Sequence, residues 1–268
     1  FKGGHMRISI SNIAWGVDDD KEMYHFLEKA NVNGIEIAPT RIFPENPYEK
    51  LQQAREYRKM LYEQYGLEVS SMQSIWFGRS EKIFEDAMQR DKLIEYTKKS
   101  FEFANAMQCH NLVFGCPKNR NINSEDDYKI AEEFFAKLGE LAKDECTVLA
   151  LEANPPIYNT NFLNTTRDAF KLVQKIASSG IKVNYDLGTV IENGEEISEV
   201  EEMLPEVNHI HISEPYLAEI HYTELHEKLI EILKKSSYDN YVSIEMKNLE
   251  NIEKVKCSVE HLLEMAGV

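Results

Sequence analysis

The chain has 268 residues, of which 43% are hydrophobic and 28% charged, a composition that excludes a disordered, collagen-like or low-complexity protein. Its 30 basic and 46 acidic residues give a net charge of −16, which repels a phosphate backbone, so we expect no nucleic-acid partner. No run of roughly 18 apolar residues predicts a membrane span, and no basic start leads into an apolar secretory segment. We therefore expect a cytoplasmic protein with no membrane partner.

Residues 1–5 resemble a tag remnant in front of Met6, so we expect one domain over residues 6–268. The cysteines form no CxxC pair or short regular spacing, which argues against a disulfide scaffold or a zinc knuckle. This cysteine usage fits a reducing cytoplasm.

Short apolar runs alternate with stretches of helical period along the whole chain. The runs predict eight strands: Arg7–Ala14, Gly34–Ala38, Glu68–Ile75, Asn111–Gly115, Thr147–Ala153, Lys182–Leu187, Asn208–Ser213 and Tyr241–Met246. The longer stretches predict helices, among them Asp20–Ala30, Tyr48–Tyr65, Ser124–Lys143, Thr166–Ser178, Tyr216–Lys235 and Asn251–Met265.

Eight strand–helix units with no linker between the halves predict an α/β fold, a single (β/α)₈ TIM barrel. The strongest rival is an open doubly wound sheet, which usually carries a glycine-rich phosphate turn after its first strand. Here that turn reads Asn12-Ile13-Ala14-Trp15-Gly16, so the fingerprint is missing. Gly66 and Gly180 stand where left-handed helix caps are expected.

Each of the last four strands carries an ionisable residue near its carboxyl end, where a buried parallel strand is expected to be apolar. These residues are Glu152, Asp186, His211 and Glu245. Alternation along each strand lets all four point into the barrel mouth. Three carboxylates there would repel one another unless a cation lies among them, so we expect one divalent metal ion: Mn²⁺, Mg²⁺, Co²⁺ or Zn²⁺.

The same residues resemble the xylose-isomerase-like barrel superfamily, in particular its sugar and sugar-phosphate isomerases and epimerases. The resemblance runs from about Arg7 to the end of the chain and is most specific at these four positions and the His-x-His of strand seven. It implies that Glu152, Asp186, His211 and Glu245 bind one divalent ion, and that Glu152 and Glu245 also act as catalytic acid and base. The implied reaction moves a proton next to a carbonyl through an enediolate.

Two departures from the family pattern concern substrate-holding residues. Strand six continues as Asp186-Leu187-Gly188-Thr189 where many sugar epimerases have Asp-x-x-His, and an arginine expected after strand seven is absent. The loop after strand five also lacks the second glutamate of the ketose epimerases. The resemblance therefore leaves open a dehydratase or lyase that acts on a sugar-derived or cyclitol substrate.

Basic residues in loops of the C-terminal face predict an anionic small substrate, and Asn154 shares the inward face of Glu152. The expected substrate-binding residues are Lys118, Arg120, Asn154, Lys247, Trp15 and Trp76, the two tryptophans as an apolar wall. We expect Glu36 and His209 to support the metal ligands from behind.

The sequence thus predicts an enzyme, a metal-dependent isomerase or epimerase of a small sugar or sugar phosphate, which can form a homo-oligomer. A noncatalytic binding protein and an apurinic-endonuclease-like DNA repair enzyme are weaker alternatives. The acidic charge argues against the DNA enzyme, and the two glutamates argue against a mere binder.

Overall fold

A closed barrel of eight parallel strands forms the centre of the computed structural model, which describes residues 6–268. The strands pair in chain order, and the last one, β8, closes the barrel on β1. The strands are β1 (Arg7–Ser11), β2 (Gly34–Ile37), β3 (Glu68–Met72), β4 (Leu112–Phe114), β5 (Leu149–Glu152), β6 (Ile181–Asp186), β7 (Val207–Ile212) and β8 (Tyr241–Ile244). The predicted fold and all eight strands are therefore confirmed.

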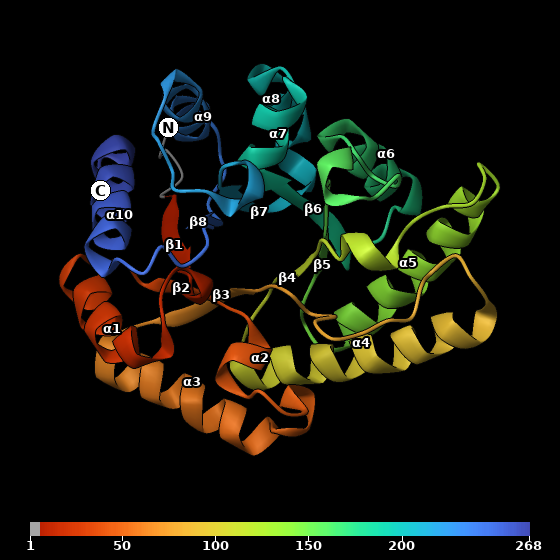
Figure 1. Ribbon diagram of the computed structural model, residues 1–268, viewed down its shortest axis with the longest axis horizontal. Helices are drawn as coiled ribbons and strands as arrows, with labels where there is room; N and C mark the ends of the chain where they lie inside the picture. The colour runs from red at the N-terminus through yellow and green to blue at the C-terminus, as the bar shows by residue number, and fades with distance from the viewer. Residues whose placement is uncertain (1–5) are drawn as a thin grey trace.

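Helices surround the strands (Figure 1). They are α1 (Asp20–Lys29), α2 (Pro39–Ile42), α3 (Leu51–Tyr65), α4 (Ala87–Met107), α5 (Asp127–Asp144), α6 (Thr166–Ile176), α7 (Leu187–Asn193), α8 (Val200–Met203), α9 (Glu224–Lys235) and α10 (Ile252–Ala266). Apolar residues of strands and helices form one continuous core, because each parallel strand is buried on both faces.

The observed elements are shorter than expected where polar capping groups and strained turns intervene. β1 ends at Ser11, whose hydroxyl accepts a hydrogen bond from Ile13 N (3.4 Å) and begins a 3-10 turn. The helix expected from Tyr216 begins only at Glu224, since Tyr216 and Leu217 adopt left-handed backbone angles with φ of 60° and 52°. An α-helix cannot pass through two such residues.

Glycine serves two different purposes at the two expected helix ends. Gly66 has a φ of 66° and caps α3, as expected. Gly180 is not a left-handed cap, because Ala177 takes that conformation after α6. A Cβ atom on Gly180 would lie 2.0 Å from the carbonyl oxygen of Gly139 in α5, so glycine is needed there for close helix–strand packing.

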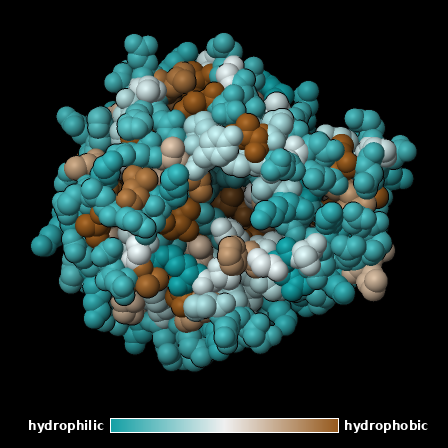
Figure 2. Space-filling model, viewed as in Figure 1, coloured by the Kyte–Doolittle hydropathy of each residue, from teal (hydrophilic) through white to brown (hydrophobic). Residues whose placement is uncertain are grey.

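Hydrophilic side chains cover most of the face shown in Figure 2, with apolar patches around a central hollow. Over the described residues, none of the helices combines the length and the apolar character that crossing a bilayer requires.

We expect Gly180→Ala to lower the free energy of unfolding by about 1–3 kcal/mol or more, because its methyl group meets main-chain atoms that cannot rotate away. Gly16→Ala is the matched control, since a Cβ there meets nothing closer than 3.8 Å. Urea unfolding of both variants measures the difference. Equal stability of the two variants would contradict the packing role.

Candidate functional site

The four ionisable residues at the strand ends come together at the C-terminal mouth of the barrel. Glu152 and Asp186 are the last residues of β5 and β6, His211 lies near the end of β7, and Glu245 follows β8 directly. Asp186 is the register partner of His211, which places their side chains on neighbouring strands at one level. One ligand atom from each of the four residues lies within 4.8 Å of the others.

Nδ1 of His211 lies at the centre of this cluster. It is 3.0 Å from Oε2 of Glu152 and 3.2 Å from Oε2 of Glu245. Burial opposes a charge on the ring, but the carboxylates of Glu245 and Glu36 outweigh burial and raise the pKa of His211 well above its usual value. The imidazole is therefore held in place by acidic groups on both sides.

Glu36 contacts His211 from the opposite side of the ring. Its Oε2 lies 3.0 Å from Nε2 of His211 and 3.1 Å from Nε2 of His209, and all three side chains are buried. A proton on Nε2 of His211 donated to Glu36 leaves the Nδ1 lone pair free for a cation, the arrangement common among metal-binding histidines. The structure thus places Glu36 and His209 directly behind the cluster.

The carboxylates of the cluster repel one another in a buried environment. Burial, together with the charge of Glu152, raises the pKa of Asp186 to about 6. Burial also raises the pKa of Glu245 to about 7, against the lowering effect of His211. A divalent cation among these groups would relieve both the repulsion and the cost of burial.

Hydrogen bonds orient each carboxylate toward the shared centre. Asn154 Nδ2 donates to Oε1 of Glu152 (3.1 Å), and Asn184 Nδ2 donates to its Oε2 (2.7 Å). Gln73 Nε2 donates to Oε1 of Glu245 (2.9 Å) and is itself held by the Ser11 hydroxyl (2.6 Å). The donors fix where the glutamate oxygens lie.

Asp186 is held by the start of α7 as well as by β7. The backbone N–H of Thr189 donates to Oδ2 (2.7 Å), as does its hydroxyl (2.8 Å), and the Ser213 hydroxyl donates to Oδ1. Thr189, which stands where many family members have histidine, therefore positions the carboxylate of Asp186.

Three oxygen donors and one imidazole nitrogen within this distance suit Mn²⁺, Mg²⁺, Co²⁺ or Zn²⁺. The buried Oδ1 atoms of Asn154 and Asn184, next to the cluster, have no hydrogen-bond partner among the described residues. The donor set and these unpartnered atoms fit a metal ion together with a polar ligand.

A cavity of about 210 Å³ opens above the cluster. It is lined by Gln73, Ser74, Val113, Gly115, Cys116, Pro117, Glu152, Asn154, Tyr158, Asp186, Leu217 and Glu245. A Cβ on Gly115 would lie 3.1 Å from Oε1 of Glu152, so glycine keeps the wall open beside that carboxylate. The cavity size suits a molecule of a few carbon atoms.

Sequence reasoning missed Gln73, Asn184 and Tyr158 as members of the site. Asn184 shares the inward face of Asp186 by alternation, so the signal for it was present in strand six. Gln73 follows β3 as a polar residue in a buried setting, which is a similar signal. Tyr158 lies in a 3-10 turn after β5 that no periodicity predicts.

Of the expected substrate-binding residues, only Asn154 lines the cavity. Lys118 and Lys247 are exposed and do not line it. Arg120 is fully buried, and its guanidinium donates to the backbone oxygens of Glu152 (2.8 Å) and Leu163 (3.3 Å). Arg120 therefore stabilises the end of β5 through these hydrogen bonds and does not line the cavity.

The two tryptophans do not form a wall of this cavity either. Trp15 is buried and donates its Nε1 proton to Asp20 (2.8 Å). Trp76 is buried, donates to Thr97 (2.8 Å) and packs edge-on against Phe114. In both tryptophans the indole nitrogen donates a hydrogen bond within the protein and the ring is buried, which is the common role of large aromatic side chains.

Comparison with family models shows that residues 24–265 match the xylose isomerase-like TIM barrel family, and the chain belongs to that family. None of the curated proteins compared with the sequence matches it.

Solved structures share the fold at low sequence identity. The 3-keto-D-glucoside 4-epimerase of E. coli is 18% identical, with a TM-score of 0.77, over 97% of this chain and 99% of the other. A D-psicose 3-epimerase structure, determined in the presence of D-fructose, is 15% identical with a TM-score of 0.79 over 97% and 98% of the two chains. A probable 3-DHS dehydratase from Bacillus anthracis is 15% identical with a TM-score of 0.73 over 96% and 98%.

The position of Arg120 gives a test that separates a structural role from a ligand-binding role. We expect Arg120→Ala to lower the free energy of unfolding by about 2–5 kcal/mol, because it leaves a cavity and removes the guanidinium donor from the carbonyl groups of Glu152 and Leu163. Lys118→Ala, at an exposed position two residues earlier, should change stability by less than about 0.5 kcal/mol. Denaturant unfolding of both variants measures the two changes in stability. An Arg120→Ala protein as stable as the Lys118→Ala protein would contradict the structural role.

Proposed function

We propose that this member of the xylose isomerase-like TIM barrel family is a divalent-metal-dependent isomerase or epimerase of a small sugar. The observation that carries the proposal is the placement of Glu152 and Glu245, whose carboxylates flank Nδ1 of His211 from two strands separated by β6 and β7. Both carboxylates line the same small cavity. Two carboxyl groups that face the same cavity can remove a proton from a bound substrate and return a proton to it.

Glu152, Asp186, His211 and Glu245 would hold the metal ion. When bound, a divalent cation supplies positive charge beside the substrate oxygens, where negative charge develops as the proton leaves. With the cation bound, Glu36 would accept a hydrogen bond from Nε2 of His211, which would leave Nδ1 free to bind the metal.

The two glutamates have different surroundings, which suits different roles. Both oxygens of Glu152 accept amide hydrogen bonds that fix their positions, whereas burial is the largest influence on Glu245 and raises its pKa to about 7. One carboxylate removes the proton next to the carbonyl to give an enediolate, and the other, protonated, supplies a proton. Return to the same carbon inverts that centre, and return to the adjacent carbon isomerises the sugar.

The cavity lining favours an uncharged sugar over a sugar phosphate. Among residues 6–268, no lysine or arginine lines the cavity, although an anionic substrate was expected from the sequence. The unpartnered Oδ1 of Asn154 is suited to accept a hydrogen bond from a substrate hydroxyl. The same lining and the charge of −16 speak against a DNA substrate.

A dehydratase is the second candidate, because Tyr158 supplies a hydroxyl to the cavity. The Tyr158 oxygen accepts a hydrogen bond from Tyr216 N (2.8 Å), so its own proton is free to be donated. Burial raises the pKa of Tyr158 to about 12, which keeps the hydroxyl protonated near neutral pH. After the same proton abstraction, a protonated group beside a β-hydroxyl would help that hydroxyl leave as water.

We expect Glu245→Gln to abolish solvent-deuterium incorporation into substrate while the protein stays folded, because the amide cannot exchange a proton with carbon. The measurement is NMR of a panel of aldoses, ketoses and keto-glycosides in D₂O with protein preloaded with Mn²⁺. Glu192→Gln, at an exposed residue of α7, is the matched control and should exchange like the parent.

Deuterium entering one carbon with parent and control, but not with Glu245→Gln, supports the proposal. Exchange by Glu245→Gln at the parental rate would contradict the acid–base role. Accumulation of an unsaturated product rather than an isomer would identify the dehydratase.

A further inference from the structure

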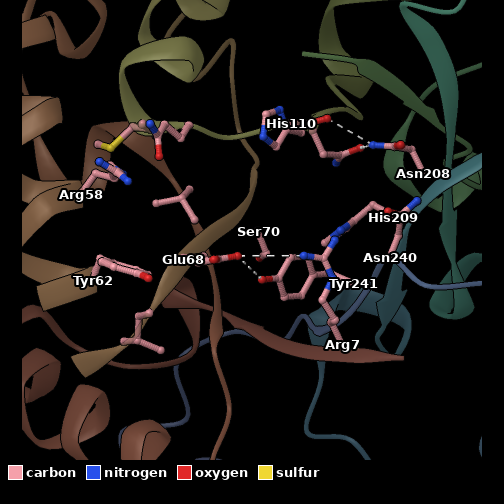
Figure 3. A pocket seen from close by; sticks show the side chains of 15 residues that line it. Arg7, Arg58, Tyr62, Glu68, Ser70, His110, Asn208, His209, Asn240 and Tyr241 are labelled. Atoms are coloured by element: carbon pink, nitrogen blue, oxygen red, sulfur yellow. Dashed lines mark hydrogen bonds and ion pairs between the residues drawn. The ribbon is translucent and has the colours of Figure 1, made fainter. Parts of the chain in front are cut away.

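A second and larger cavity, of about 560 Å³, lies at the opposite end of the barrel from the carboxylate cluster. The amino-terminal ends of β1, β3, β7 and β8 border it, together with α3 and the end of α4 (Figure 3). Its size falls within the range of pockets that hold small molecules. The proposed reaction makes no use of it.

The pairing between β3 and β4 is short beside this cavity. β3 and β4 share one register pair, Met72 with Leu112, whereas β4 and β5 share three. The residues of β3 that precede Met72 have no register partner on β4. The cavity is lined by Ser70 of β3 and by Asn111, which directly precedes β4. The cavity thus borders the part of β3 and β4 that precedes their register pair.

The lining carries one positive charge in excess. Arg7 stacks over the Tyr241 ring at 4.1 Å and lies 4.0 Å from Glu68, so these two charges balance each other. Arg58, which points toward the cavity from α3 in Figure 3, makes no ion pair with any described residue. An unbalanced guanidinium in a concave site is suited to a carboxylate or phosphate.

Polar side chains line other parts of the cavity. The side-chain amides of Gln108, which is exposed, and of Asn240 line it and make no hydrogen bond within residues 6–268. His209, which is 1% exposed, also lines it, and its Nε2 lies 3.1 Å from Oε2 of Glu36. The two amides can bind hydroxyls or carbonyl oxygens that accompany an anionic group.

We propose that this cavity is a binding site for a small hydroxylated organic anion, with Arg58 contacting its carboxylate or phosphate and the amides of Gln108 and Asn240 contacting its hydroxyls. The site is separate from the catalytic cavity, whose lining contains no arginine or lysine from the described part of the chain.

The proposed site has a short physical connection to the carboxylate cluster. His209 borders the cavity, its Nε2 lies 3.1 Å from Oε2 of Glu36, and the same oxygen lies 3.0 Å from Nε2 of His211. A ligand that shifts the ring of His209 therefore acts on the group that orients His211. Ligand binding and cation binding are then coupled, and the coupling is reciprocal.

Calorimetric titration of the metal-free protein tests the binding site without reliance on the proposed reaction. The probes are D-gluconate and D-glucose 6-phosphate, with D-glucose and inorganic phosphate as comparisons. We expect at least one of the two organic anions to bind in the millimolar range or tighter and more tightly than glucose. We also expect Arg58→Gln to weaken that binding by about tenfold or more.

Two variants locate the binding. Arg55→Gln, on an exposed residue of the same helix that does not line the cavity, should bind like the parent, and so should Asn154→Ala in the catalytic cavity. Circular dichroism confirms that Arg58→Gln is folded. Absence of binding by both organic anions, or equal binding by Arg58→Gln and Arg55→Gln, would overturn the site.

Mn²⁺ titration with and without the bound anion tests the connection, which rests on the proposed metal site. A change in Mn²⁺ affinity that is lost in Arg58→Gln supports it. An unchanged Mn²⁺ affinity with the anion bound would overturn the connection. Failure of the protein to bind Mn²⁺ at all would overturn it together with the metal site, while the anion titration would still decide on the cavity.

Discussion

Repulsion among buried carboxylates is the constraint on which the mouth of this barrel depends. Glu152, Asp186 and Glu245 lie close enough for one ligand atom of each to fall within 4.8 Å of the others and of His211. Burial and this repulsion raise the pKa of Asp186 to about 6 and that of Glu245 to about 7, and a single imidazole offers the only positive charge that the residues of this cluster can supply. A divalent cation at the centre of the cluster would relieve this repulsion, as the proposed function requires.

The barrel keeps these groups together because parallel strands end at one face. Register pairing sets Asp186 beside His211, and Glu152 beside Asn184, whose amide then reaches a carboxylate oxygen of Glu152. Glu36 lies on β2, on the far side of His211. Burial alone would raise the pKa of Glu36, but the two histidines lower that pKa below its usual value. Glu36, which does not line the cavity above the cluster, is thus one of the residues that orient the imidazole.

Residues in strands, or within two positions of a strand end, were more predictable than residues farther into the loops. Alternation along a strand decides which side chains point inward, so Glu152, Asp186, His211 and Glu245 follow from the sequence. Loop residues have no such rule: Arg120 follows β4 by only a few positions, yet its side chain turns inward to hold the carbonyls of Glu152 and Leu163. Trp15 and Trp76 likewise pack inside the fold, and a pattern of residue types does not predict this packing.

The close packing of Gly180, which precedes β6, against α5 could not be predicted from the sequence either. Gly180 fits a helix cap by position, but its real neighbour is Gly139, which is 41 positions away in the chain. The cavity at the amino-terminal end borders the part of β3 and β4 that precedes their single register pair, a detail of sheet geometry that strand prediction does not contain. Long-range contacts of this kind require the folded structure.

The most direct test of the account is the metal stoichiometry of the purified protein after dialysis against Mn²⁺, measured by elemental mass spectrometry. The account predicts about one Mn²⁺ per chain. It also predicts loss of that ion in a variant that combines Asp186→Asn with His211→Gln, two of the four ligands. A metal-free parent protein, or an unchanged stoichiometry in the variant, would contradict the central claim that these four side chains form one divalent metal site.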